Sequence, residues 1–422
     1  MLALRLARGA RPLVQLRRLL VAAASAGTGF LLLCTLGYAL MHPETPDRAS
    51  LRLLWCLAPM AATVYFAVAV ARTDPGTRPR SGLATIGLGP ARMMALSSAT
   101  TALSTLFGSL LALLAFLHLR GDLPGTPLNG AGPTFLASDQ PLPLPATLTL
   151  LALVPFTASV ASAFALRPKD GRPPRAGRRG DAGTRAGAAP DTFNEPDISD
   201  IPATPGSPGE ASAPDGLPDA PPVPGGLPWG VAALAAGLAV ETHASQAARS
   251  PGLHLPGGIA SGPLWVLAGW ALTSLGLALA GPALAHLCGK LLQSARPGAL
   301  RLLAGRGLQE EARRIGGPLG VVCAVASGAY ATAALYGGTQ PSFGPLAVLG
   351  AVLVAGCALA TLATAAVEAR QERSESIAAL VRMGAPARVL RTSALLRAAA
   401  LAVVFVPVTW LVAELAAIPL AR

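Results

Sequence analysis

Runs of about twenty apolar residues recur along the whole chain, and they restrict its fold more than any other feature. A helix of that length, rising ~1.5 Å per residue, crosses the ~30 Å hydrocarbon core of a bilayer. The runs are 19–41, 51–72, 94–117, 146–166, 262–286, 317–337, 345–367 and 394–418, with a shorter one at 228–243. The sequence therefore predicts an all-α polytopic membrane protein with about nine transmembrane helices.

Composition supports the same class. Only 13 % of the residues are charged and 52 % are hydrophobic, whereas a soluble protein carries about a quarter charged residues. The abundance of Ala, Gly, Pro and Arg is typical of a GC-rich bacterial genome. We therefore expect a multi-pass protein of the bacterial cytoplasmic membrane.

The distribution of positive charge predicts the orientation of the chain. With nine spans and a cytoplasmic N-terminus, 28 of the 33 Lys and Arg residues fall in cytoplasmic segments, where they are favoured. Without 228–243 as a span, basic loops at one end of the chain would lie outside. Because the charge is spread over five loops and aromatics make up only 5 %, a nucleic-acid partner is not expected.

Cysteine and other ionisable residues give no sign of a cofactor or metal. The five Cys form no C-x-x-C pair and are odd in number, so we expect small buried residues rather than a disulfide or zinc site. Glu241, His243 and Glu414 lie near the ends of predicted spans, where we expect them to be hydrated.

The N-terminal run is longer than the core of a cleavable signal, which predicts a retained first span.

The two ends of the chain resemble each other at a constant offset. Arg17-Arg18 matches Arg313-Arg314, and Pro90-Ala91-Arg92 matches Pro386-Ala387-Arg388, both 296 residues apart. At this offset the first three spans fall on the last three and enter the membrane from the same side, so the repeats are parallel. We predict four parts: a first permease repeat of four spans at 1–166, a disordered cytoplasmic linker at 167–227, two connecting spans at 228–300, and a second repeat of three spans at 301–422. The linker is rich in Pro, Gly and charge and cannot bury an apolar core.

One cytoplasmic segment carries a distinctive pattern between the last two spans. Ile377, Leu380 and Val381 recur at i, i+3, i+4, which makes a narrow apolar stripe on a short helix. Gly384-Ala-Pro386 then predicts a bend before the final membrane helix. The first copy has Leu83 and Ile86 before Gly89-Pro90 in the same way.

The segment SESIAALVRMGAPARVLRTSALLRAAAL resembles the signature of FtsX-like (MacB-type) ABC transporter permeases, and RLLAGRGLQEEARRIGGPLGVV resembles the entry to the preceding spans in that family. The resemblance covers 1–166 and 300–422. It implies two FtsX-like half-repeats whose cytoplasmic helices dock on a separate ABC ATP-binding subunit, in two copies. The second repeat departs from the family in having three spans instead of four.

The resemblance assigns an ATPase-docking role to one set of residues: Arg373, Glu375, Ile377, Leu380, Val381, Met383, Gly384 and Arg388. Ile377 and Leu380 would enter an apolar groove of the ATPase, Arg373 and Glu375 would pair on its rim, and Gly384 would supply the bend. A weaker counterpart in the first repeat is Leu83, Ile86, Gly89 and Arg92. The alternative is an amphipathic helix on the membrane surface.

The sequence contains no G-x-x-x-x-G-K-[ST], H-E-x-x-H or G-x-S-x-G motif, so we expect no enzymatic activity in this chain and ATP binding in trans. The leading hypothesis is the permease subunit of an ABC transporter that moves, and more specifically exports, an amphiphilic substrate. The alternatives are a non-transporting mechanotransmitter or sensory partner of an ABC ATPase, and an ATP-independent membrane scaffold.

Overall fold

The computed structural model of the chain is built of helices. It describes residues 12–73, 90–122, 136, 140–167, 225–247, 261–294, 298–335, 344–382, 384 and 386–421. These ranges contain helices and connecting turns and no strand. The helical fold class is therefore confirmed, whereas the predicted linker 167–227 lies outside the described residues except at its two ends.

Within the part of the chain that the structure describes, seven helical segments are long and apolar enough to cross a membrane. They are Val14–Met41, Pro46–Thr73, Ala95–Arg120, Leu144–Ala165, Ala268–Ser294, Pro345–Ser374 and Arg388–Ala417. Seven of the predicted runs overlap these segments for most of their length, which supports a multi-pass helical membrane protein. The other two runs, 228–243 and 317–337, lie in α8 (Leu227–Ala247) and α10 (Ala299–Leu335), which are not among the seven. The count of nine spans stays a prediction.

The second of these segments is made of two helices. It consists of α3 (Pro46–Trp55) and α4 (Leu57–Thr73), which meet at Cys56. The interruption has a local cause, because Pro59 has no amide hydrogen to donate to the carbonyl of Trp55. The sequence analysis predicted one uninterrupted run here.

Two polar stretches that flank predicted spans are helical. The last two long helices are α11 (Pro345–Arg382) and α12 (Ala387–Ala421). We expected a separate short helix after a span at 345–367, but α11 is continuous over 38 residues, about 57 Å at ~1.5 Å per residue. Glu, Gln, Arg and Ala dominate residues 368–376 and are good helix formers. Likewise, α10 begins 18 residues before the predicted start of its span at 317.

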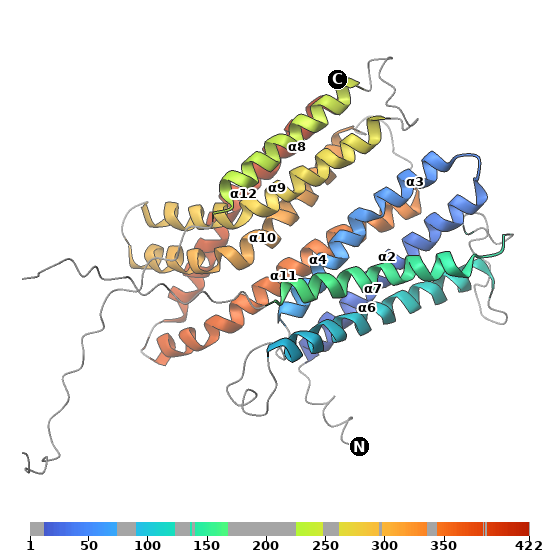
Figure 1. The fold of residues 1–422 in the computed structure, drawn as a ribbon. Coiled ribbons are helices and arrows are strands. Elements are labelled where there is room, and N and C mark those ends of the chain that lie inside the picture. The colour runs from blue at the N-terminus through green and yellow to red at the C-terminus, as the bar shows by residue number, and fades with distance from the viewer. Residues whose placement is uncertain are drawn as a thin grey trace, which may run out of the picture. The chain divides into compact units, whose positions relative to one another are not determined.

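Glycine brings α10 unusually close to the preceding helix, α9 (Ser261–Ser294). A Cβ added at Gly281 would lie 2.0 Å from the carbonyl oxygen of Gly316, and one added at Gly289 would lie 2.8 Å from that of Gly305. Small residues at helix crossings allow such close contact in membrane proteins. The two helices therefore form a tight antiparallel hairpin (Figure 1).

Small and hydroxylated residues also hold the N-terminal helices together. In α2 (Pro12–Met41) the Ser25 hydroxyl donates to the carbonyl of Thr105 in α6 (Pro90–Arg120) at 2.8 Å. The hydroxyls of Thr28 in α2 and Thr63 in α4 lie 2.9 Å apart and share a hydrogen bond. A further helix, α7 (Leu144–Ala165), packs on α2, α4 and α6.

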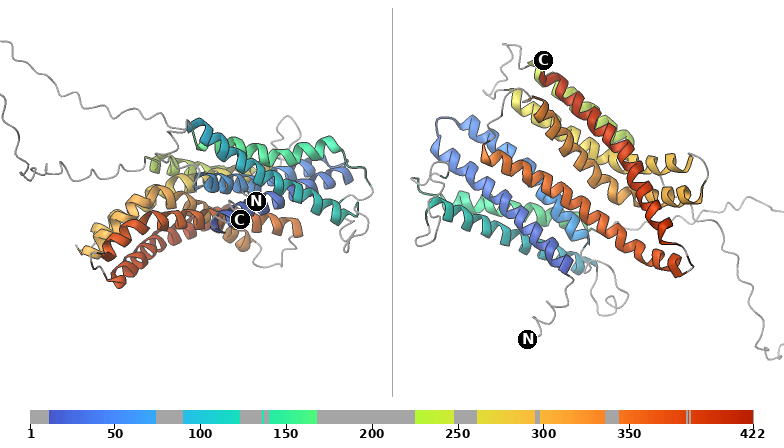
Figure 2. Two further views of the ribbon diagram at one scale, coloured as in Figure 1. Left: turned by 90° about the horizontal axis from the view of Figure 1, so that it is seen from below. Right: turned by 180° about the vertical axis from the view of Figure 1, so that it is seen from behind.

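The helices form two groups that share α11. The first group is α2, α4, α6 and α7, and the second is α8, α9, α10 and α12. The orange helix α11 lies between them in Figures 1 and 2, with contacts to α4 and α2 on one side and to α10 on the other. Thus α11 belongs to the second half of the sequence but packs on helices of the first.

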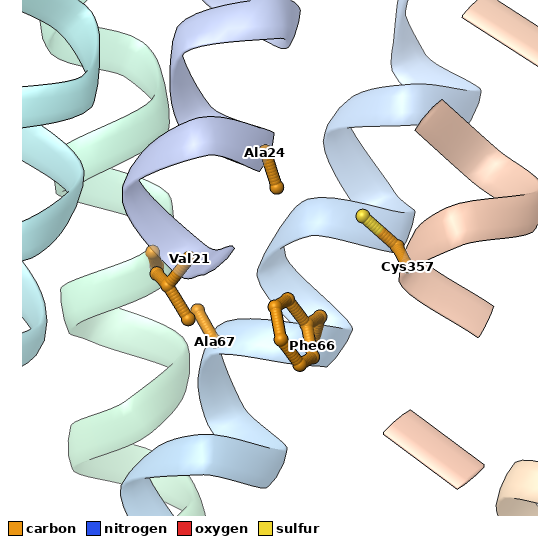
Figure 3. Close-up of a cluster of buried hydrophobic side chains, with 6 residues drawn as sticks. Val21, Ala24, Phe66, Ala67 and Cys357 are labelled. Carbon is orange, nitrogen blue, oxygen red and sulfur yellow. The ribbon is translucent and has the colours of Figure 1, made fainter. Parts of the chain in front are cut away.

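The contact of α11 with the first group is apolar and tight. Cys357 of α11 lies in a buried cluster with Val21, Ala24, Phe66 and Ala67, and Figure 3 shows it directed toward α2 and α4. All five cysteines of the chain are buried, which confirms the prediction that they are small buried residues.

Candidate docking segment at the turn between α11 and α12

The turn between α11 and α12 has the geometry of a bend that depends on glycine. Gly384 has a φ of 88°, a backbone conformation that residues with a Cβ rarely adopt. A Cβ added there would meet no atom within 4 Å, so the requirement is conformational and not steric. After the turn, the amide of Val389 donates to the carbonyl of Pro386 at 3.0 Å and begins α12.

The apolar stripe predicted for docking is described only at the level of the backbone. Glu375, Ile377, Leu380 and Val381 lie in the last turns of α11, and nothing is described of their side chains. Met383 lies outside the described residues. The contact of this stripe with an ATPase therefore stays a prediction.

The remaining predicted docking residues are described to different extents. Arg388 is exposed in the first turn of α12. In the first copy, Leu83, Ile86 and Gly89 lie outside the described residues, and Arg92 is described only as part of helix α6.

Arg373 makes its contacts within the chain. Its guanidinium donates to the carboxylate of Glu311 in α10, and its Nε donates to the carbonyl of Ala369 at 3.2 Å. The Glu311 side chain is only 11 % exposed. The structure thus shows Arg373 of α11 in contact with α10, and the predicted pairing of Arg373 and Glu375 on the rim of an ATPase stays a prediction.

A second arginine converges on the same carboxylate from α12. Nη1 of Arg397 lies 3.7 Å from Oε1 of Glu311, and its side chain is 13 % exposed. Gly307 leaves room for this guanidinium, because a Cβ there would lie 2.6 Å from Nη2 of Arg397. Glu311, Arg373 and Arg397, from three different helices, are called the Glu311 cluster below.

Burial dominates the electrostatics of this carboxylate. Removal from water raises the pKa of Glu311 above its usual range, while Arg373 and then Arg397 pull it down. The net direction is upward, so the carboxyl group binds a proton more readily than an exposed glutamate does.

A second ion pair joins α10 to α11 beside this cluster. Arg314 donates to the carboxylate of Glu372, with side chains 45 % and 38 % exposed. The hydrogen bond from Arg314 to Glu372 raises the pKa of the guanidinium. An exposed pair of this kind stabilises by only about 0–1 kcal/mol.

The sequence analysis did not include Glu311 or Arg397 among its candidates. One signal was present: Glu310 and Glu311 are adjacent acids in an otherwise basic segment, 290–314. Arg397 likewise stands alone within an apolar run at the start of the last span. Neither pattern indicates which residue of the chain these side chains contact.

A buried acid elsewhere corrects an expectation about hydration. Glu241 in α8 is 3 % exposed, and the Thr273 hydroxyl of α9 donates to it at 3.4 Å. Gly269 accommodates it, since a Cβ there would lie 2.6 Å from Cγ of Glu241. Its neighbour His243 is exposed, and Glu414 accepts a hydrogen bond from Tyr330 at 2.9 Å. Among the described residues, no group of three or more His, Cys, Asp or Glu side chains could hold a metal ion.

Comparisons with protein-family models, with curated proteins and with solved structures give no match. The resemblance to FtsX-like permeases therefore depends on the residues of the α11–α12 segment and of α10 quoted above.

Proposed function

We propose that the chain is the membrane-spanning permease subunit of an ABC transporter in the bacterial cytoplasmic membrane, with its N-terminus in the cytoplasm. It would pair with two copies of a separate ATP-binding subunit and export an amphiphilic substrate. The observation that carries this proposal is the turn at Gly384, which joins two long helices that also extend into polar sequence. A long helix on each side of the turn would transmit the motion of a bound ATPase to the membrane-spanning helices.

The helix boundaries support two repeats in this proposal. Shifted by 296 residues, Pro90 at the start of α6 falls on Pro386, one residue before α12 begins. On the same shift, α2 overlaps α10, and α3 with α4 overlaps α11. The packing corresponds too, because α2 packs on α6 and α10 packs on α12.

The direct test is coupling to an ATPase. The chain in lipid nanodiscs should bind the ABC ATPase encoded beside its gene and raise the rate of ATP hydrolysis. Replacement of Ile377 and Leu380 by Asp should abolish that stimulation, because a carboxylate cannot enter an apolar groove without a large desolvation penalty. Ala378→Asp is the matched control: it adds the same charge to the same helix at a position outside the apolar stripe.

The outcomes separate the alternatives. Unchanged stimulation in the Ile377 and Leu380 variants would contradict the docking assignment, and no binding to any ABC ATPase would favour the scaffold. Stimulation without movement of a fluorescent phospholipid across the bilayer would favour the mechanotransmitter. That alternative needs an extracellular handle, and the predicted outer loops are short.

A further inference from the structure

The helices on either side of the docking turn are held by a third helix. Within the described residues, α12 packs mainly on α10, and α11 packs on α4 and α10. Gly384 is exposed and has open space around it. Gly384 itself therefore supplies no packing that could fix the angle between α11 and α12.

Glu311 is placed to fix that angle. One of its carboxylate oxygens accepts from Arg373 of α11, and the other lies 3.7 Å from Arg397 of α12. Arg373 lies about three helical turns before Gly384, and Arg397 lies about three and a half turns after it. A single buried carboxylate on α10 thus neutralises charges on both helices that flank the turn.

Loss of the negative charge of Glu311 should change the geometry of the Glu311 cluster. Without the negative charge of Glu311, Arg373 and Arg397 would face the same site on α10 as two like charges, in a partly desolvated position. Gly307 keeps Arg397 close to α10. The repulsion would therefore act mainly on α11, which the exposed ion pair of Arg314 with Glu372 also joins to α10.

We propose that Glu311 is the positioning residue of the docking turn: it holds α11 and α12 at a fixed separation through Arg373 and Arg397, and it passes a displacement of the turn to α10. The meaning of the turn as a docking segment rests on the proposed function. The positioning itself is a property of the chain alone.

The test is a distance measurement across the turn in the whole chain in nanodiscs, without an ATPase. Spin labels are attached at Ala378→Cys in α11 and Ala394→Cys in α12, both exposed positions. The five native cysteines are buried, so the labels go to the introduced ones. Pulsed EPR should give one narrow distance in the parent chain, and Glu311→Gln should shift it to longer values and remove the single peak.

Three controls decide the outcome. Glu310→Gln removes an exposed carboxylate next to Glu311 and should leave the distance unchanged. Arg373→Gln should broaden the distance, and the double variant with Glu311→Gln should broaden it no further, because the two residues act through one contact. A label pair on α2 and α6, at Leu20→Cys and Leu103→Cys, should be unaffected.

The proposal is overturned if Glu311→Gln keeps the parent distance, if Glu310→Gln broadens it equally, or if the α2–α6 pair broadens with it. The last result would show general loosening of the fold. Since no ATPase is present, these results are independent of whether the chain binds one.

Discussion

Two adjacent glycines in α10 allow the packing of the α9–α10 hairpin to be tested by a single added methyl group. A Cβ at Gly316 would lie 2.5 Å from the Cα of Pro282, which is a backbone atom of α9. Ordinary contact begins at about 3.4 Å, so the two helices would have to separate locally by about 0.9 Å. At Gly317 the nearest atom is the hydroxyl of Tyr65, 3.6 Å away, and a methyl group fits without movement.

The free-energy difference follows from this geometry. Replacing Gly by Ala inside a helix favours folding by about 1 kcal/mol, and this gain is common to both variants. Overpacking that forces backbone shifts costs about 1–3 kcal/mol and applies only to Gly316→Ala. We expect Gly316→Ala to be less stable than Gly317→Ala by about 1–3 kcal/mol.

The assay is unfolding by SDS in mixed micelles, followed by circular dichroism for the parent and both variants. Gly317→Ala should match or exceed the stability of the parent chain. If Gly316→Ala is as stable as Gly317→Ala, the close approach of α9 and α10 is wrong.

One further prediction concerns the docking turn itself. Gly384→Ala should lose stimulation of a bound ATPase, since a left-handed conformation costs a residue with a Cβ about 1–2 kcal/mol; Gly356→Ala, in an open position inside α11, is the control and should retain stimulation.

The apolar spans could be predicted because hydropathy is a local property. Each run is long enough to be recognised without knowledge of its neighbours. The sequence analysis did not predict that α10 begins as early as 299 or that α11 continues as far as 382. The added residues, 299–316 and 368–382, are largely polar, so hydropathy does not reveal them and gives little sign of where they pack. The break at Cys56 could have been found from Pro59, three residues later.

The Glu311 cluster could not be predicted for a different reason. Its members are brought together by tertiary packing, with Arg373 lying 62 residues from Glu311 in the sequence and Arg397 farther still. Without knowledge of its contact with Glu311, Arg373 could equally be interpreted as a surface residue that contacts an ATPase. The turn at Gly384 was accessible to sequence analysis, because Gly and Pro act on their own backbone.

The most direct test of the account is the side of the membrane on which the α11–α12 turn lies. Arg388→Cys is exposed next to the turn, and Arg52→Cys lies on the predicted outer side. With a membrane-impermeant maleimide, intact cells should label Arg52→Cys and leave Arg388→Cys unlabelled, and inverted vesicles should give the reverse. Labelling of Arg388→Cys from outside intact cells would place the turn out of reach of any cytoplasmic ATPase and would contradict the proposed function.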